Sequence, residues 1–397
     1  MPSPTADYYS VASGQPVNAG RFAGGRLAGA VTLDDAVATG AFGVNFSALS
    51  GAVALDDAVA AGAFTGYVMP SWLAGQPLNT WISIPGTSGA GGSAINAFSM
   101  FVVKQSTAEL ISAASGGHTD SYDNGVYSIR LTDNAPAWVT RKAGSTVVQE
   151  AVLYYADGLP TSRHTYQHNH YIPSLDAVLM AGCRFGYGGA APEGPGMDLF
   201  SLSTNQWLPR YTYPDIPAAS GNGIVKDGSG GIWTTSGKRF DTATSIWATM
   251  GISLPRFPSI YDPLRDQIFS LQCGNGEDGV QTVVSQKVAC STAVKTTVTF
   301  NASAALTQFT TAGALYLGMD YDAPNDRFLA THQGEAGVVY VITPNAGSVW
   351  DIGLLSVSGS VSAGTGGTQK KFQFISSLNG FALITQAASA IYFLRTA

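Results

Sequence analysis

The stretch that decides the fold is YDAPNDRFLA, residues 321–330, in which an aromatic residue precedes a turn rich in Asp, Pro and Asn and an apolar segment follows. The same pattern returns in YIPSLDAVLM (171–180) and YDPLRDQIF (261–269). Apolar segments on both sides of such turn residues are the usual signal of a β-hairpin. Further copies, one of them degenerate, are VKDGSGGIWT (225–234), ISSLNGFAL (375–383) and VVKQSTAELIS (102–112).

A second repeated feature lies downstream of these hairpins, where a strand ends in a polar turn and a Trp opens the next strand. These residues are Trp138, Trp207, Trp247 and Trp350, and we expect Phe300 to take the same place in the unit that lacks a Trp. The five positions are spaced by about 40 to 70 residues. Repeats of about 40–50 residues built from four short strands are typical of β-propeller blades.

The last unit of this series ends too early. After IYFLRTA (391–397) there is no further turn and Trp strand, but NTWISIPG (79–86) supplies one near the start of the series. A strand from one end of the domain that completes the last blade closes the ring and removes an open sheet edge. We therefore predict an all-β, six-bladed propeller closed by an N-terminal strand, with seven blades as the alternative count.

The composition agrees with short strands joined by tight, neutral turns. Charged residues make up 12% of the chain, against about 25% in average soluble domains, and 47 residues are Gly. The formal net charge is −6 and the one adjacent Lys pair is Lys370-Lys371, so nucleic acid is not an expected partner. Since no apolar run approaches the ~18 residues that span a bilayer, membrane insertion is not expected either.

The N-terminal residues differ from the repeated units. LAGAVTLDDAVATGAF (27–42) and LSGAVALDDAVAAGAF (49–64) are nearly identical and do not recur. Each copy is too small to bury its apolar residues alone, which predicts an extended arm over residues 1–75, used for anchoring or oligomerisation, and a propeller over 76–397. The candidate anchoring residues are Leu27, Leu33, Asp34, Asp35, Phe42, Leu49, Leu55, Asp56, Asp57 and Phe64.

Two segments resemble the kelch family of propellers. GGHTDSYDNGVYSIRL…W (116–138) has the Gly pair, Tyr and later Trp of a kelch unit, and RHTYQHNHYIPSLDAVLMAGC (163–183) is similar to a blade opening, with Gly-Cys in place of Gly-Gly. The resemblance implies the galactose-oxidase/kelch propeller fold, a scaffold shared by oxidases, lectins and interaction modules. No motif matches the oxidases' copper ligands at the far end of the chain, so no cofactor is predicted.

The doubled repeat is similar to the anchoring segments that precede receptor-binding domains in tailed-phage fibres and spikes. This resemblance implies a virion protein made in the host cytoplasm, and the start MPSPTADYYS has no signal-peptide pattern. The expected partners are other virion proteins through residues 1–75, a host-surface glycan or protein receptor, and further copies of the chain. The alternatives are a non-catalytic carbohydrate-binding bacterial propeller and a propeller enzyme, either an oxidase or a glycan-cleaving one.

Candidate binding residues gather in two segments, RHTYQHNH (163–170) and GGHTDSYDN (116–124). If 163–170 is a strand, its three His share one face, and two of them stand ~7 Å apart along it. No further ligand falls at a spacing that completes a metal site, so lining of the ring interior is the alternative role and no metal is predicted. The candidate residues for a ligand or receptor are His118, Asp120, Tyr122, Arg163, His164, His168 and His170.

Other polar residues are interpreted as structural. The carboxylates Asp262/Asp266 and Asp322/Asp326 recur at matching hairpin positions, which indicates turn chemistry rather than a catalytic pair. The cysteines Cys183, Cys273 and Cys290 have no metal-binding spacing, and only the last two are close enough in sequence to raise the question of a disulfide. No catalytic residue is predicted.

Overall fold

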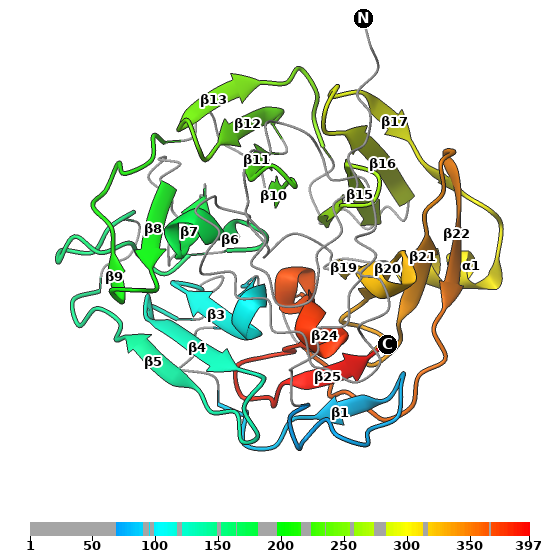
Figure 1. Cartoon of the computed structure of the whole chain (residues 1–397), viewed down its shortest axis with the longest axis horizontal. Helices are drawn as coiled ribbons and strands as arrows, with labels where there is room; N and C mark the ends of the chain where they lie inside the picture. The colour runs from blue at the N-terminus through cyan, green and yellow to red at the C-terminus, as the bar shows by residue number, and fades with distance from the viewer. Residues whose placement is uncertain are drawn as a thin grey trace, which may run out of the picture. The chain divides into compact units, whose positions relative to one another are not determined.

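The computed structural model of the chain describes residues 69–89, 95, 99–116, 121–148, 152–163, 165–181, 197–215, 224–234, 236–254, 258–273, 283–312, 317–364 and 367–397. Within them, six sheets, antiparallel except for one added outer strand, surround a common axis as the blades of a propeller (Figure 1). The predicted all-β, six-bladed fold is confirmed, and the alternative count of seven is wrong. The predicted anchoring residues of the two repeats lie outside the described residues.

Each of the first three blades consists of four consecutive strands, the first of which lies nearest the axis. Blade 1 contains β2 (Val102–Lys104), β3 (Glu109–Ala113), β4 (Val126–Arg130) and β5 (Val139–Lys142). Blade 2 contains β6 (Asn169–Ile172), β7 (Ala177–Ala181), β8 (Met197–Ser201) and β9 (Gln206–Trp207). Blade 3 contains β10 (Ile224–Lys226), β11 (Gly231–Thr234), β12 (Lys238–Asp241) and β13 (Ile246–Thr249).

Blade 4 keeps this plan, and blades 5 and 6 vary it at their outer edges. Blade 4 contains β14 (Ser259–Asp262), β15 (Gln267–Cys273), β16 (Val283–Ala289) and β17 (Lys295–Thr297). Blade 5 contains β19 (Gly318–Asp322), β20 (Arg327–Thr331), β21 (Tyr340–Thr343), β22 (Val349–Leu354) and the added outer strand β18 (Thr299–Phe300). Blade 6 contains β23 (Phe372–Ile375), β24 (Gly380–Leu383), β25 (Tyr392–Arg395) and β1 (Trp81–Ser83).

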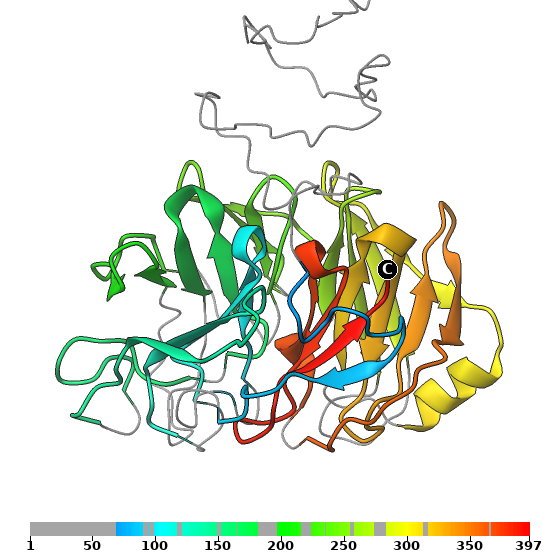
Figure 2. The same ribbon diagram turned by 60° about the horizontal axis from the view of Figure 1, so that its bottom comes forward.

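The ring is closed by β1, as predicted. This strand pairs antiparallel with β25 at the other end of the chain, in the register Trp81↔Leu394 (Figure 2). The Trp81 side chain is buried, and its indole N–H donates to the carbonyl of Gly337 in blade 5 at 2.9 Å. Both ends of the described ring are therefore held in one sheet, in which β1 is the outermost strand.

The prediction for Phe300 is wrong. Its strand β18 does not complete blade 4 but runs parallel to β22 of blade 5, with Phe300 opposite Trp350. The outer strand of blade 4 is instead β17, whose three residues are all exposed polar ones. The outer strand of blade 4 therefore has no aromatic residue. The residue just after β17, Val298, is buried in the core between blades 4 and 5 instead.

The quoted hairpins join the first and second strands of each blade, and each of their turns ends in a left-handed residue. In blade 3 this residue is Gly230, with φ 82°; in the other blades φ lies between 44° and 49°, and the residues are Ala108, Asp176, Asp266, Asp326 and Asn379. Asp and Asn tolerate this conformation better than most residues. Where the pattern begins with Tyr and ends with Asp, the two side chains bond, as in Tyr321 Oη donating to Asp326 Oδ1 at 2.6 Å.

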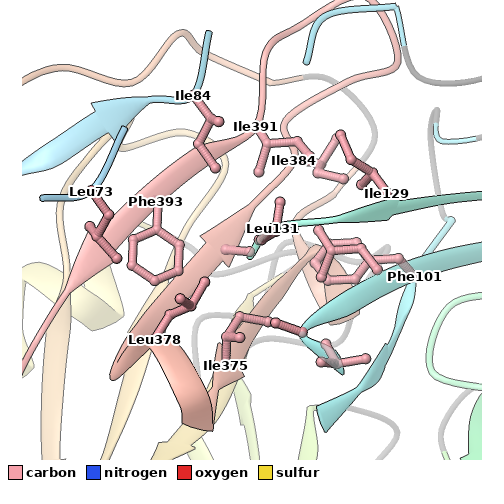
Figure 3. Packing of buried hydrophobic residues seen from close by; sticks show 14 of the residues in the cluster. Leu73, Ile84, Phe101, Ile129, Leu131, Ile375, Leu378, Ile384, Ile391 and Phe393 are labelled. Atoms are coloured by element: carbon pink, nitrogen blue, oxygen red, sulfur yellow. The ribbon is translucent and has the colours of Figure 1, made fainter. Parts of the chain in front are cut away.

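The hydrophobic core is divided into wedges between neighbouring blades. Successive residues of the second strand point to opposite faces, so that Phe381 of β24 packs toward blade 5 while Ala382 packs toward blade 1. Figure 3 shows the wedge between blades 1 and 6, whose single cluster includes Phe101 and Ile129 of blade 1 and Phe393 of blade 6. Because both faces of each blade are buried, these strands are apolar without alternation.

The propeller begins a few residues earlier than the predicted boundary at 76. Trp72 and Leu73 are buried in the wedge between blades 1 and 6, where the Trp72 ring meets that of Phe393 edge to face at 5.3 Å. The Trp72 indole N–H also donates to the carbonyl of Leu131 in blade 1. Residues from Met69 onward therefore belong with the ring.

Two features lie outside the sheets. The one α-helix among the described residues, α1 (Ala304–Thr311), is capped by Ser303, whose Oγ accepts from the Leu306 N–H at 3.0 Å. None of the described helices is long and apolar enough to cross a membrane. Cys290 is a free thiol at the far end of the β15–β16 hairpin from Cys273, so these two cysteines do not pair.

Candidate functional site

Strand order divides the ring into two faces. The turns between first and second strands lie on one face; the connections between second and third strands, and those from blade to blade, lie on the other, here called the connection face. Tyr122 lies in the β3–β4 connection, and Arg163 and His168 lie in the β5–β6 connection. The predicted binding residues that the structure describes thus come from the connection face or, for His170, from the adjoining strand β6.

Residues 165–169 bond residues of two other blades. Thr165 Oγ1 accepts from the Met100 N–H of blade 1 at 3.0 Å. The buried Gln167, which leads into blade 2, accepts with Oε1 from the Ser259 N–H at the start of blade 4 at 3.1 Å. Asn169 in turn donates to the carbonyl of Ala113 in blade 1. One connection therefore joins three blades at the mouth of the ring.

The condition for a shared face of the His side chains, a strand over 163–170, is not met at residues 165–168. A tight turn precedes β6, with the His168 N–H bonded to the Thr165 carbonyl at 2.6 Å and Tyr166 at φ 39°, and the strand starts at Asn169. His168 is buried against Tyr166, whereas His170 lies in the innermost strand. His164 lies outside the described residues. Among those that are described, no three His, Cys, Asp or Glu gather in a way that could hold a metal ion.

His170 is a half-buried residue of β6, close to the positively charged Lys226 and Lys370. Its pKa is held well below the usual value, first by burial and then by repulsion from Lys226, Lys370 and His168. Lys370 itself pairs with Asp320 at 3.3 Å. His170 is therefore neutral at neutral pH, and this part of the interior favours an uncharged ring.

Acidification is expected to destabilise the fold through His170. Below the ordinary His pKa of about 6.5, the unfolded chain binds a proton that the folded chain does not. The free energy of unfolding therefore decreases as the pH is lowered, by up to about 1.4 kcal/mol per pH unit from this residue. Urea unfolding at pH 7.5, 6.5 and 5.5 should show a shallower decline for His170→Gln than for the parent. Equal slopes for the two proteins would contradict this assignment.

Arg163 is fully buried and forms an ion pair with Asp198. Its Nη1 lies 3.1 Å from Asp198 Oδ2, and its Nη2 donates to the Leu153 carbonyl at 2.7 Å. The other carboxylate oxygen of Asp198 accepts from the Tyr154 hydroxyl at 2.8 Å. Burial and the negative Asp198 raise the pKa of Tyr154, so its hydroxyl stays protonated. Arg163 thus fixes the position of Tyr154 through Asp198, and its burial keeps it from contacting a ligand.

The tyrosine supported in this way stacks on an exposed arginine that the sequence analysis missed. The guanidinium carbon of Arg210 lies 4.2 Å from the centre of the Tyr154 ring and 4.6 Å from that of Tyr211. Tyr211 is 61% exposed and adopts φ 65°. We call Arg210, Tyr154 and Tyr211 the Arg210 cradle. The sequence signal was the doubled aromatics in LYYAD and RYTY, but these segments are more than 50 residues apart.

The β3–β4 connection is largely engaged in local bonds. The Tyr122 carbonyl accepts from the Tyr155 hydroxyl at 2.7 Å, and burial raises the pKa of Tyr155 to about 12. Asp123 accepts from the Gly125 N–H and the Tyr127 hydroxyl, and Asn124 bonds Ser145 in both directions. His118 and Asp120 lie outside the described residues.

The paired carboxylates serve the hairpins and join neighbouring blades. Asp262 accepts from two backbone N–H groups of its own turn. Arg265 of blade 4 bonds both oxygens of Asp326 in blade 5, at 2.7 and 2.6 Å, and these bonds lower the pKa of Asp326. Asp322 holds Arg327 at 2.7 Å. These contacts agree with the structural interpretation of both pairs.

A small hollow of about 300 Å³, counting space open to solvent, lies between blades 5 and 6. Its polar lining includes His332, Gln333, Thr368 and Thr385. The His332 Nδ1 accepts from the Gly334 N–H at 3.1 Å, so this nitrogen of the imidazole stabilises the local turn. The Arg210 cradle presents exposed side chains, whereas most of the polar lining of this hollow is buried.

The six sheets, their closure by β1 and the wedge cores define the class of this protein as a six-bladed β-propeller. Neither a family model nor a curated protein matches the sequence. Among solved structures, the chain is similar to YjhT, with a TM-score of 0.44 and 10% identity, over 78% of this chain and 94% of that one. It is also similar to U3-55K (TM-score 0.39, 8% identity, 80% and 98% covered) and to a protein of unknown function from Bacteroides thetaiotaomicron (0.40, 12%, 79% and 74%).

Proposed function

We propose that this chain is a structural and adhesive component of a tailed-bacteriophage virion, such as a fibre, spike or decoration protein. Residues 1–75 would bind other virion proteins, and the propeller would be displayed for contact with a host-surface glycan or protein. The observation that carries this proposal is the doubled sequence repeat, which precedes in the sequence a ring whose sheets close without it. We also propose that the repeated unit of the propeller is of the kelch type.

The closed ring supports a division of labour between the two parts. Since β1 completes blade 6, the ring needs no residue before Met69 to satisfy its sheet edges. The LDDAVA repeats are then available for another surface, and two similar copies suit two equivalent contacts on a multimeric partner. We propose that the chain acts as a homo-oligomer on that partner.

The receptor-contact role is supported by the connection face. Binding residues collect on loops that a rigid scaffold positions, and the Arg210 cradle presents an exposed aromatic ring and a cation from two such connections. The same observation favours a second candidate, a non-catalytic carbohydrate-binding propeller of bacterial origin. The two candidates share the binding face and differ in what residues 1–75 attach to.

Particle association tests the virion proposal directly. Particles purified on a density gradient from lysates of cells that carry this gene should contain the chain, detected by mass spectrometry together with capsid and tail proteins. A variant lacking residues 1–68 should be lost from that fraction while remaining folded. If the full chain stays with soluble proteins, the virion proposal fails and the bacterial carbohydrate-binding propeller takes its place.

Limited proteolysis is expected to separate the two parts of the unassembled protein. Chymotrypsin should cut after aromatic residues of the arm such as Phe42, Phe64 and Tyr67, and leave a resistant core that begins close to Met69. Trypsin is the control, because there is no Lys or Arg between Arg26 and Lys104 and it should remove only the first 26 residues. Intact-mass analysis identifies the products, and a chain that resists chymotrypsin throughout would contradict the proposal.

A further inference from the structure

We propose that the Arg210 cradle is a binding site for the carboxylate of an acidic saccharide. This inference rests on the proposed receptor-contact role and names its ligand class. The site lies on the connection face, where the β5–β6 connection supplies Tyr154 and the β9–β10 connection supplies Arg210 and Tyr211.

The first argument is the state of the arginine. Among the described residues, no carboxylate lies within ion-pairing distance of Arg210, and its recorded contacts are the faces of two tyrosine rings. A guanidinium stacked on aromatic faces keeps its N–H donors at its edge, in the planar fork that matches a carboxylate. Arg210 is exposed, so these donors face solvent.

The second argument is that the site is built before a ligand arrives. Tyr154 cannot rotate freely, because its hydroxyl is bonded to Asp198 and Asp198 is fixed by the buried Arg163. Two arginines thus flank the Tyr154 ring, Arg163 with its guanidinium carbon 5.6 Å from the ring centre and Arg210 at 4.2 Å. A side chain held in place before binding loses less conformational entropy when the ligand binds.

The third argument concerns the ligand's ring. Tyr211 is one of the most exposed large side chains of the described residues, and its left-handed backbone is held by the turn in which the Thr212 N–H bonds the Pro209 carbonyl. An exposed tyrosine beside a guanidinium offers an apolar face for a sugar ring next to a donor for its acid group. A neutral sugar would use the tyrosine alone and leave the guanidinium without a partner.

The experiment is an array of uronic- and sialic-acid-bearing oligosaccharides, each beside its methyl ester, probed with the full-length chain. The acids should bind and the esters should not, and added salt should weaken the binding. Titration calorimetry on the best acid should show binding weaker by about tenfold for Arg210→Lys, which keeps the charge but loses the fork, and by more for Arg210→Met.

One further variant of the site and one control variant complete the test. Tyr211→Ala should weaken binding, whereas Arg130→Met, which removes an exposed arginine at the opposite face, should not change it. Thermal unfolding of each variant verifies that the fold is kept. Equal binding of acids and esters, unchanged binding by Arg210→Met, or an array without any bound acid would each overturn the inference. None of these outcomes affects the particle-association result, so the two proposals can fail separately.

Discussion

Removal of β1 is expected to abolish cooperative folding of the propeller. A chain that starts at Met69 should unfold with the same urea midpoint as the full chain, while a chain that starts at Thr87 should aggregate or unfold without a sharp transition. The shorter chain loses the partner of β25 and leaves the carbonyl and amide groups of that strand as an open edge. It also loses two buried residues from the wedge between blades 1 and 6, Trp72 and Leu73, of which Figure 3 shows Leu73.

A single substitution tests the same closure within the intact chain. Trp81→Ala removes a buried indole and its bond to the Gly337 carbonyl, and should lower the free energy of unfolding by about 3–5 kcal/mol. The matched control is Trp247→Ala in the outer strand β13, whose ring is partly exposed and should cost less. Equal losses for the two variants, or a stable chain starting at Thr87, would show that the ring closes in another way.

The elements that the sequence predicted are those fixed by local chemistry. The Tyr–Asp pair of each of three hairpins spans five residues, so its turn is encoded in one short segment, and the Tyr321–Asp326 bond is the direct result. The closing strand was also predictable, because a repeat that lacks its last strand requires one from elsewhere. Phe300 was misplaced because a polar outer strand followed by Val298 breaks the Trp repeat on which the prediction depended.

The candidate site was less accessible from sequence because its contacts join distant segments. RHTYQHNH was a candidate binding segment from the sequence, but its turn at Tyr166 and its bond to Ser259 depend on neighbouring blades. Arg163 was a candidate ligand contact from the sequence, but its side chain is buried and pairs with Asp198. The exposed partner, Arg210, carries no motif of its own and is identified only by the two rings that it touches.

Breaking the buried Arg163–Asp198 pair is expected to be as damaging as opening the ring. The two side chains are 0% and 5% exposed, so Asp198→Asn would leave a guanidinium charge desolvated without its counter-charge. Loss of one partner of a buried ion pair costs about 3–5 kcal/mol, whereas an apolar replacement of both partners costs much less. Urea unfolding should therefore rank Asp198→Asn and Arg163→Met as severe and the double replacement Arg163→Met/Asp198→Leu as milder than either.

The exposed pair Lys104–Asp176 provides the contrast. Its carboxylate is 37% exposed and can be hydrated when the lysine is removed, so Lys104→Met should cost no more than about 1 kcal/mol. A loss of similar size for Asp198→Asn would mean that water reaches Arg163, and the support of Tyr154 from below would then be weaker than the distances indicate. If Asp198→Asn is instead severe and Arg210→Met leaves stability unchanged, the two arginines beside Tyr154 have separate roles: the buried Arg163 stabilises the fold, and the exposed Arg210 is available to bind a ligand.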